Sequence, residues 1–301
     1  METQASKVVV ITGTSSGLGK LTAKELATQG HRVYASMREP DGRNRSARDE
    51  LMALAHSGGL HLRVLEIDVT CDESVSAGIA EVLECEDHID VLINNAGVMH
   101  VGVTEAFCLD EVRSQFEVNF HGALRMNQAV LPSMRAHGSG LLVHLSSLAG
   151  RLTFPFFGIY CASKFALEAM AESLRYELSS FGVDSILVEP GLFWTGLIHK
   201  SPPNGKDVER LASYGEVARI PGSLLTSFTQ RLTAKDAPDP QMVADAIAGL
   251  IAMEGPRPLR TAVGQDLGVG DLNRSVAPVQ ASLLKELGLS HLAPHSAKAP
   301  L

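Results

Sequence analysis

Two residues that could carry acid–base chemistry stand four positions apart in the segment GIYCASKFALEAMAESLRYEL. They are Tyr160 and Lys164, and the helical pattern of this segment places both side chains on one face. A phenol with a pKa of about 10 is a poor acid–base catalyst at neutral pH. A nearby ammonium group favours the phenolate and lowers that pKa. The spacing therefore predicts that Tyr160 is an acid–base group and that Lys164 lowers its pKa.

Two further polar residues could complete a catalytic group with this pair. Ser147 lies 13 residues before Tyr160, at the end of an apolar run, and its hydroxyl could hydrogen-bond the reacting oxygen. Asn119, in VNFHG, could order a water next to Lys164 and complete a proton path. A Tyr-xxx-Lys pair alone is common on solvated helix faces. Its combination with Ser147 and with the glycine-rich turn described next argues against that alternative.

A glycine-rich turn, TGTSSGLG, lies between the first apolar run and the first helical pattern, with GxxxGxG spacing. Glycine lets a backbone turn tightly and approach a pyrophosphate without a Cβ clash. The N-terminus of the following helix offers unpaired N–H groups to an anion. We therefore expect a dinucleotide to be bound here. The candidate residues are Gly13, Ser15, Ser16, Gly17, Leu18 and Gly19.

The end of the second apolar run, YASMR, bears on the choice of cofactor. Dinucleotide-binding folds place an acid there when they bind the ribose 2′-hydroxyl of NAD. Met37 stands at that place, and the guanidinium of Arg38 could hold a 2′-phosphate instead. These residues favour NADP(H), and NAD(H) is the alternative. Arg38 could be a surface arginine, or Glu39 could fold back onto the ribose and favour NAD(H).

Together these motifs resemble the short-chain dehydrogenase/reductase family over about Lys7 to Leu197. The matching segments are TGTSSGLG, Asp68-Val69, Asn94-Asn95-Ala96-Gly97, Asn119, Ser147, Tyr160-xxx-Lys164 and PGLFWT. The stretch PFFGIYCASKFALEAMAESL is most similar to the 17β-hydroxysteroid and retinol dehydrogenase branch. The resemblance implies an Asn–Ser–Tyr–Lys tetrad at Asn119, Ser147, Tyr160 and Lys164.

The resemblance also implies roles for individual residues. Tyr160 would be the acid/base, Ser147 would stabilise the carbonyl, and Lys164 would also bind the cofactor ribose. Asp68 and Val69 would flank the adenine. The other implied cofactor contacts are Asn95, Ala96 and Gly97 on the adenosine ribose side, and Pro190, Gly191, Phe193 and Thr195 at the nicotinamide end.

The segments expected around the nicotinamide are apolar and aromatic. The candidate substrate contacts are Val98, Ser147, Phe154, Phe157, Phe193 and Trp194. Such a lining suits a small hydrophobic carbonyl or alcohol better than a sugar phosphate. Each of the aromatic side chains could instead belong to the hydrophobic core.

The elements that must position these residues follow from the alternation of apolar, β-branched runs with longer helical patterns. The predicted strands are Lys7–Thr12, Arg32–Ser36, Leu62–Ile67, Val91–Ile93, Leu141–Leu145 and Ser185–Val188, with a seventh near residues 258–266, and the first helix is Gly17–Gln29. Near-continuous apolar strands separated by helices indicate a parallel sheet covered on both faces. We therefore predict an α/β fold with a single doubly wound, Rossmann-type domain and a central sheet of about seven strands.

This domain is expected to span residues 1–301, with two additional segments. Residues 196–240 follow the last strand end that faces the ligand, and we predict a substrate loop or lid there; a disordered insert is the alternative. Residues 270–301 are apolar enough to pack and are predicted to form a docked C-terminal appendage or a dimer contact. The polar Glu39–Arg48 segment is predicted to be an exposed loop.

Charge and composition limit the partners. The net charge of −8, without a basic cluster, argues against nucleic acid and anionic membranes. No apolar run is long enough to span a bilayer, and no signal-peptide pattern precedes the first strand. The 4 cysteines and 11 histidines lack metal-binding spacing. We therefore expect a cytoplasmic protein without a metal, and the family resemblance implies a homodimer or homotetramer.

These patterns favour an NADP(H)-dependent oxidoreductase that transfers a hydride between the nicotinamide and a hydrophobic ketone or secondary alcohol. One alternative is an NAD-dependent alcohol dehydrogenase of the same family. Another is a non-catalytic, cofactor-bound sensor or scaffold, because a fold alone does not prove a function. The complete tetrad favours an enzyme.

Overall fold

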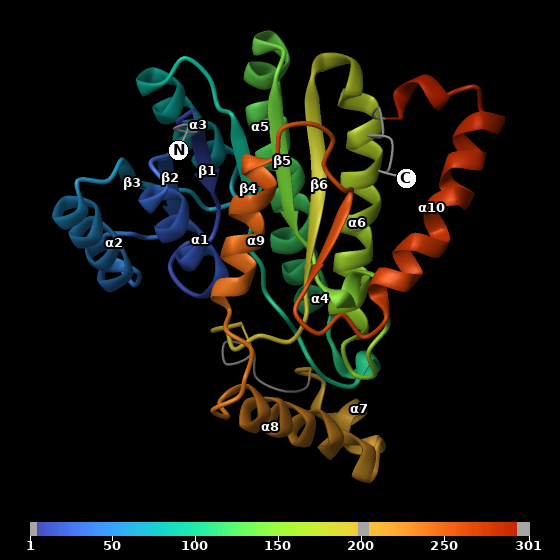
Figure 1. The fold of residues 1–301 in the computed structure, drawn as a ribbon. Coiled ribbons are helices and arrows are strands. Elements are labelled where there is room, and N and C mark those ends of the chain that lie inside the picture. Colours follow the sequence, from blue (N-terminus) through green and yellow to red (C-terminus); the bar gives the residue numbers. More distant parts are fainter. Residues whose placement is uncertain (1–4, 198–204, 294–301) are drawn as a thin grey trace.

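The apolar runs of the sequence form one parallel sheet of seven strands (Figure 1). A computed structural model describes residues 5–197 and 205–293. The strands are β1 (Val8–Ile11), β2 (Arg32–Met37), β3 (Leu62–Glu66), β4 (Val91–Asn94), β5 (Gly140–Leu145), β6 (Val183–Pro190) and β7 (Arg260–Val263). Their order is β3-β2-β1-β4-β5-β6-β7, and all neighbouring pairs are parallel. This confirms the predicted doubly wound α/β domain, and each predicted strand overlaps an observed one.

Helices connect the strands and cover both faces of the sheet. The α-helices of the described residues are α1 (Gly17–Thr28), α2 (Arg45–Gly58), α3 (Asp72–Cys85), α4 (Leu109–Phe116), α5 (Gly122–His137), α6 (Gly158–Leu178), α7 (Val208–Ser213), α8 (Ile220–Leu232), α9 (Gln241–Ala252) and α10 (Val269–Glu286). Short helical turns occur at η1 (Thr104–Ala106), η2 (Glu117–His121), η3 (Leu148–Gly150), η4 (Ser179–Phe181), η5 (Gly215–Arg219) and η6 (Ser290–Leu292).

Two hydrophobic clusters hold the layers together. Helices α1, α2 and α9 pack on one face of the sheet, where Leu26 and Ile247 are buried. Helices α3, α5 and α6 pack on the other face, where Ile79 and Met126 are buried. Because both faces are covered, β1 is buried along its whole length.

Residues 45–58 form α2, which differs from the expected loop. The predicted exposed segment Glu39–Arg48 remains a loop only as far as Asn44, and α2 begins at Arg45. Leu51 and Ala55 are the buried residues of α2. The overlap with the predicted loop is the first turn of α2, residues 45–48, whose sequence RSAR contains no large apolar residue to reveal the helix.

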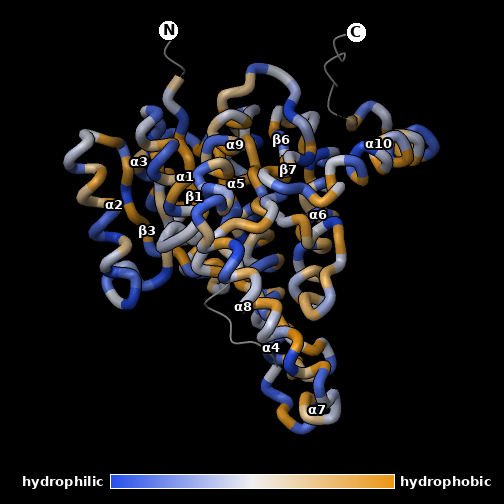
Figure 2. The backbone as a smooth tube through the Cα atoms, turned by 60° about the horizontal axis from the view of Figure 1, so that its bottom comes forward, coloured by the Kyte–Doolittle hydropathy of each residue, from blue (hydrophilic) through white to orange (hydrophobic). Residues whose placement is uncertain are grey.

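Two segments extend the core domain. The described part of the predicted lid, residues 205–240, contains α7 and α8, which are helical rather than irregular. Figure 2 shows these helices standing out from the rest of the molecule, with apolar and polar residues mixed along them. Residues 198–204 of the predicted lid lie outside the described residues. The C-terminal helix α10 packs near β7 at the sheet edge, and its far end points away from the body (Figure 1).

Two further features of the described residues are the hydropathy of the helices and the state of the cysteines. None of the helices in residues 5–197 and 205–293 combines the length and hydropathy that crossing a bilayer requires. All four cysteines, each within these ranges, are free thiols.

Helix α1 approaches the end of β4 closely at Gly19. The Asn95 amide nitrogen donates hydrogen bonds to the carbonyl oxygens of Thr12 (2.7 Å) and Gly13 (3.0 Å), which joins the ends of β1 and β4. A Cβ on Gly19 would overlap this amide and would lie 2.7 Å from the Gly13 carbonyl oxygen. A residue without a side chain is therefore required where the helix crosses this junction.

We expect Gly19→Ala to lower the free energy of unfolding by about 1–3 kcal/mol, because the methyl group would overpack the junction. Gly249→Ala is the matched control, since it lies in α9 and no described atom comes within 4 Å of its Cβ position. The control should gain about 0.5–1 kcal/mol from better helix propensity. Urea denaturation of both variants measures the difference, and an equal response of the two would contradict the packing argument.

Candidate active site

A cavity of about 450 Å³ lies where the strands end, at the carboxyl edge of the sheet. Ligands bind at this edge in open α/β sheets, next to the point where the strand order reverses, here between β1 and β4. Most residues that the sequence predicted at the site line this cavity. They are Gly13, Ser15, Ser16, Gly17, Leu18, Arg38, Asp68, Val69, Asn95, Ala96, Gly97, Val98, Ser147, Phe154, Phe157, Tyr160, Lys164, Pro190, Gly191, Phe193 and Thr195.

Three described residues that the sequence predicted at this site, Gly19, Asn119 and Trp194, do not line the cavity. Gly19 serves the helix–strand contact described above instead of a ligand contact. Trp194 is half-buried, and its neighbours Phe193 and Thr195 face the cavity in its place.

The glycine-rich turn forms one end of the cavity. Gly13 and Gly17 have φ angles of 70° and 60°, a left-handed conformation that glycine adopts without strain. A Cβ on Gly13 would also lie 2.9 Å from the Ala96 Cα. Ser16 precedes the first turn of α1, whose backbone N–H groups and positive dipole end would suit an anion bound at this position.

Two arginines and an asparagine line the neighbouring part of the cavity, beyond the end of β2. Arg38 was predicted here, whereas Arg43 and Asn44 were not. The Asn44 side-chain amide donates to the Arg38 carbonyl oxygen at 2.6 Å, which holds the turn closed. The Arg38 guanidinium lies 3.8 Å from the Asp68 carboxylate. The described residue Glu39 is not on the wall and pairs with Arg43 at 3.2 Å.

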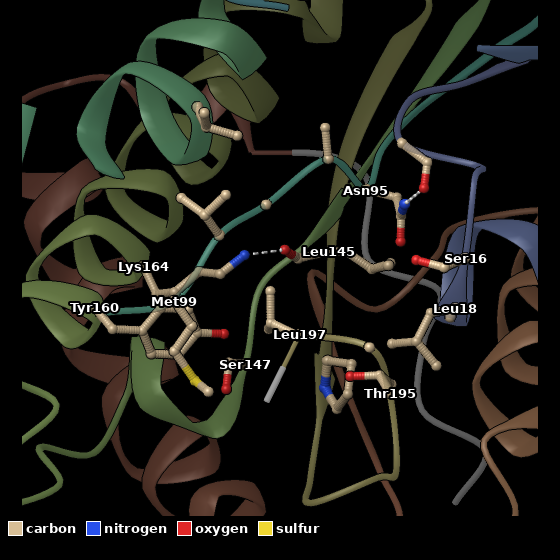
Figure 3. Close-up of a pocket in the computed structure, with 18 of the residues that line it drawn as sticks. Ser16, Leu18, Asn95, Met99, Leu145, Ser147, Tyr160, Lys164, Thr195 and Leu197 are labelled. Carbon is tan, nitrogen blue, oxygen red and sulfur yellow. Dashed lines mark hydrogen bonds between the residues drawn. The ribbon is translucent and has the colours of Figure 1, made fainter. Parts of the chain in front are cut away.

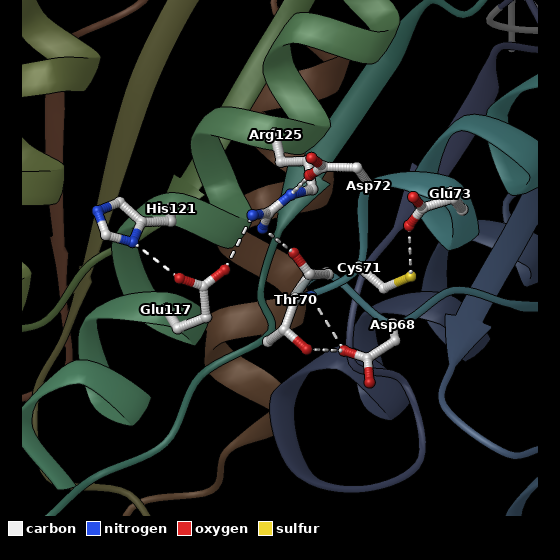
Figure 4. Close-up of polar contacts among 9 residues, drawn as sticks. Asp68, Thr70, Cys71, Asp72, Glu73, Glu117, His121 and Arg125 are labelled. Carbon is white, nitrogen blue, oxygen red and sulfur yellow. Dashed lines mark hydrogen bonds and ion pairs between the residues drawn. The ribbon is translucent and has the colours of Figure 1, made fainter. Parts of the chain in front are cut away.

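A polar network fixes the loop after β3, on which Asp68 and Val69 lie (Figure 4). One Asp68 oxygen accepts hydrogen bonds from the backbone N–H (3.0 Å) and the hydroxyl (2.7 Å) of Thr70. Arg125, on α5, donates to the Val69 carbonyl oxygen at 2.5 Å and to Glu117 at 2.9 Å, and it also pairs with Asp72. The loop is therefore fixed by hydrogen bonds within it and by hydrogen bonds from Arg125 of α5.

The opposite end of the cavity contains Ser147, Tyr160 and Lys164 (Figure 3). Tyr160 and Lys164 lie one turn apart on α6, as predicted, and Ser147 follows the end of β5. Figure 3 shows the Tyr160 and Ser147 hydroxyl groups turned toward one another. The Lys164 ammonium donates to the Leu145 carbonyl oxygen at 2.7 Å, and its Nζ lies 5.9 Å from the Tyr160 ring centre.

Burial dominates the ionisation of this pair. Burial raises the pKa of Tyr160 to about 12, and the hydrogen bond with Ser147 opposes the rise. Burial likewise lowers the pKa of Lys164 to about 8, and the charge of Glu168 opposes that fall. The expectation that Lys164 lowers the pKa of Tyr160 is therefore not met in this structure. The reason is that desolvation of the phenolate outweighs an ammonium that is directed at Leu145.

Asn119 occupies a helical irregularity next to the site. Its amide nitrogen donates to the Val98 carbonyl oxygen (2.9 Å) and to the Ser163 hydroxyl (3.0 Å), and its amide oxygen accepts from the Val98 N–H (2.8 Å). The π-helical turn η2 between α4 and α5 produces this orientation. The Asn119 side chain therefore joins the segment after β4 to α6 and does not point into the cavity.

The part of the cavity near Tyr160 is apolar. Phe154 and Phe157 line it as predicted, with ring centres 6.2 Å apart. Phe228 of α8 also lines this end of the cavity, with its ring centre 6.1 Å from the ring centre of Phe157. The sequence did not single out Phe228, because α8 lies about 70 residues further along the chain.

The comparison with known proteins agrees with this geometry. Residues 7–205 match the family model described as short chain dehydrogenase. The chain is 37% identical to human 17-beta-hydroxysteroid dehydrogenase type 1 over 257 residues (84% of this chain, 76% of that protein). It is 35% identical to human retinol dehydrogenase 8 over 261 residues (85% and 81%). It is also 34% identical to 3-ketodihydrosphingosine reductase of Bacteroides thetaiotaomicron over 263 residues (86% and 88%).

Solved structures show the same relationship. A short-chain dehydrogenase from Streptomyces avermitilis has a TM-score of 0.75 and 32% identity, covering 96% of this chain and 98% of that one. A variant of actinorhodin polyketide ketoreductase, solved with NADPH, has a TM-score of 0.70 and 27% identity, covering 90% and 100%. The chain therefore belongs to the short-chain dehydrogenase/reductase family of oxidoreductases, in the branch of the 17β-hydroxysteroid and retinol dehydrogenases.

Proposed function

We propose that this protein is an NADP(H)-dependent oxidoreductase that reduces a hydrophobic ketone, or oxidises the corresponding secondary alcohol. One observation carries the proposal: a single cavity joins the glycine-rich turn at Gly13 to the hydroxyl groups of Ser147 and Tyr160. A phosphate-binding end and an acid–base end in one cavity are what hydride transfer from a dinucleotide requires.

The residues present fit a nicotinamide dinucleotide. The glycine turn leaves a cradle that a Cβ on Gly13 would fill, and the α1 N-terminus suits a pyrophosphate. Pro190, Gly191, Phe193 and Thr195 would hold the nicotinamide end, and Lys164 would bind the adjoining ribose. The cofactor supplies the hydride or accepts it, and the protein supplies the remaining groups.

The chain's own residues would handle the proton and the substrate oxygen. Ser147 would hydrogen-bond the carbonyl oxygen, and the Tyr160 hydroxyl would donate the proton that this oxygen needs as it becomes an alcohol. A Tyr160 pKa raised to about 12 keeps the phenol protonated at neutral pH. The protonated phenol is the form that a reduction uses, whereas alcohol oxidation needs the phenolate and would speed up as the pH rises. We therefore propose that the Tyr160 phenol is ready to donate its proton in a reduction at neutral pH.

The residues near the end of β2 support NADP(H) over NAD(H). Arg38 and Arg43 both line the cavity there, and Met37 stands where an acid would select a free 2′-hydroxyl. The alternative is that Glu39 turns onto the ribose; Glu39 is not itself on the cavity wall, but its carboxylate pairs with Arg43, which is. The related ketoreductase that was solved with NADPH supports a nicotinamide dinucleotide and does not decide between the two cofactors.

The substrate end supports a hydrophobic, lipid-like ketone or alcohol. Phe154, Phe157, Met99 and Phe228 surround the space near Tyr160. The names of three relatives refer to a steroid, to retinol and to a ketodihydrosphingosine. Because Phe228 belongs to α8, we propose that residues 205–240 act as a lid over this end. A cytoplasmic location and a homodimeric or homotetrameric assembly stay predictions.

We expect Tyr160→Phe to lower kcat by about 10²- to 10⁴-fold while the affinity for NADPH stays within about twofold, because only the proton donor is lost. Tyr34→Phe is the matched control. Its phenol is also buried but hydrogen-bonds Glu86 at 2.9 Å, and neither residue lines the cavity. Steady-state kinetics and cofactor titration measure both quantities. A Tyr160→Phe kcat within threefold of the wild-type value would refute the assignment.

We expect Arg38→Gln to weaken NADPH binding by about 10- to 100-fold, the loss typical of a hydrogen bond to a charged group. NADH binding should hardly change, because NADH lacks the 2′-phosphate. Arg45→Gln removes the same charge from an exposed position away from the cavity and should affect neither cofactor. Fluorescence titration of the variants with both reduced cofactors decides the matter. Tighter NADH than NADPH binding by the wild-type protein would show that Arg38 faces solvent.

A further inference from the structure

Buried charged side chains meet behind the cavity, where α6, β6 and β7 pack together. Glu168 of α6 is 2% exposed and Glu189 at the end of β6 is fully buried. Arg260 of β7 lies between them, with its Nε 2.8 Å from a Glu168 oxygen and 3.7 Å from a Glu189 oxygen. None of these described residues lines the cavity, so none is explained by contact with a ligand.

Other polar groups complete the surroundings of this arginine. Glu172, one turn after Glu168 on α6, lies 2.6 Å from Arg260. Asn273 of α10 donates to Glu189 at 2.7 Å and accepts from Arg151 at 2.8 Å. Three carboxylates thus share Arg260, and Arg151 adds a second positive charge through Asn273.

Glu168 also lies one helical turn from Lys164. Residues four apart on a helix are neighbours, and both side chains are buried, so water screens their attraction weakly. Burial lowers the pKa of Lys164 to about 8, and Glu168 is the group that opposes this fall. Among the described residues, the other ionisable groups that face Lys164 are Tyr160 and His144. Both are uncharged at neutral pH, because burial raises the pKa of Tyr160 and lowers the pKa of His144 to about 3.

Arg260 stabilises the negative charge of Glu168 more directly than that of Glu189, because its Nε lies 2.8 Å from Glu168 and 3.7 Å from Glu189. Burial and the charge of Glu168 raise the pKa of Glu189 to about 7. Burial raises the pKa of Glu168 as well, and the contact with Arg260 opposes that rise. The Glu168 side chain packs closely against Gly150, because a Cβ on Gly150 would lie 2.9 Å from the Glu168 Cγ.

We propose that Glu168, anchored by Arg260, is a positioning residue for Lys164: its buried carboxylate keeps the Lys164 ammonium charged in a site that excludes water. The importance of this charge for turnover rests on the proposed function, but the charge itself does not. Without the carboxylate, Lys164 would lose its proton at a lower pH, and the ribose contact and proton transfer that depend on the ammonium would be lost with it.

The test compares Glu168→Gln with Glu172→Gln in the full-length protein. Both changes remove one carboxylate charge from Arg260 while keeping the side-chain shape, and only the first lies next to Lys164. The readout is the titration of the Lys164 amine by NMR in protein labelled with ¹⁵N-lysine, with Lys164→Arg to identify the signal. We expect the pKa of Lys164 to fall by about one unit in Glu168→Gln and by less than about 0.3 unit in Glu172→Gln.

The same variants separate this inference from the proposed function. If the enzyme turns over, the alkaline limb of the kcat profile should move to lower pH with the amine in Glu168→Gln alone. If no turnover is found but the amine shifts as expected, the proposed function fails and the inference stands. An unchanged amine pKa, or an equal shift in both variants, would overturn the inference.

Glu168→Asp keeps the test open in case the Gln variant does not fold. It retains the charge at a greater distance, so the pKa of Lys164 should fall in the same direction by less than in Glu168→Gln. A fall of a full unit or more in this variant, which keeps the carboxylate, would show that packing rather than charge sets the amine pKa and would overturn the inference.

Discussion

The junction between the ends of β1 and β4 is the constraint on which the site depends. The Thr12 hydroxyl accepts hydrogen bonds from the backbone N–H groups of Asn95 and Ala96, both at 3.0 Å, and the Asn95 amide returns bonds to the first strand. The strand order reverses here, so this pair of ends opens the crevice that becomes the cavity. From the same junction the chain continues to Val98, whose backbone N–H donates a hydrogen bond to Asn119. Asn119 in turn donates to the hydroxyl of Ser163, which precedes Lys164 on α6. The phosphate-binding turn and the acid–base helix are therefore tied to one point.

Desolvation acts on both titratable groups that we propose for the chemistry, because both side chains are buried. Tyr160 is 6% exposed and Lys164 5% exposed. Burial pushes both toward their neutral forms, which suits a proton donor but opposes an ammonium. The charge of Glu168 opposes the fall in the pKa of Lys164. Burial therefore separates the pKa values of Tyr160 and Lys164, and Glu168 narrows that separation.

Local patterns in the sequence were sufficient for the fold and for most of the site. β-Branched runs such as Val8–Ile11 and the four-residue spacing of Tyr160 and Lys164 depend only on neighbours along the chain. Features that depend on tertiary contacts were missed. Arg43 and Asn44 reach the cavity through the shape of a turn, and Phe228 reaches it from a distant helix. The role predicted for Asn119 beside Lys164 stays a prediction, and its contacts with Val98 and Ser163 follow from a π-helical turn that no simple period reveals. The raised pKa of Tyr160 depends on burial, which the sequence does not report for a single residue.

The central claim is that this cavity carries out direct hydride transfer and is more than a cofactor-binding sensor. NADPH that carries deuterium at the transferable C4 position would be incubated with the wild-type protein and a panel of steroid-like and aromatic ketones, followed by mass spectrometry of the alcohols formed. The account predicts one deuterium on the carbinol carbon of at least one product, with formation of NADP⁺ in equal amount. NADPH binding without deuterium in any product of the panel would contradict it and favour a sensor or scaffold.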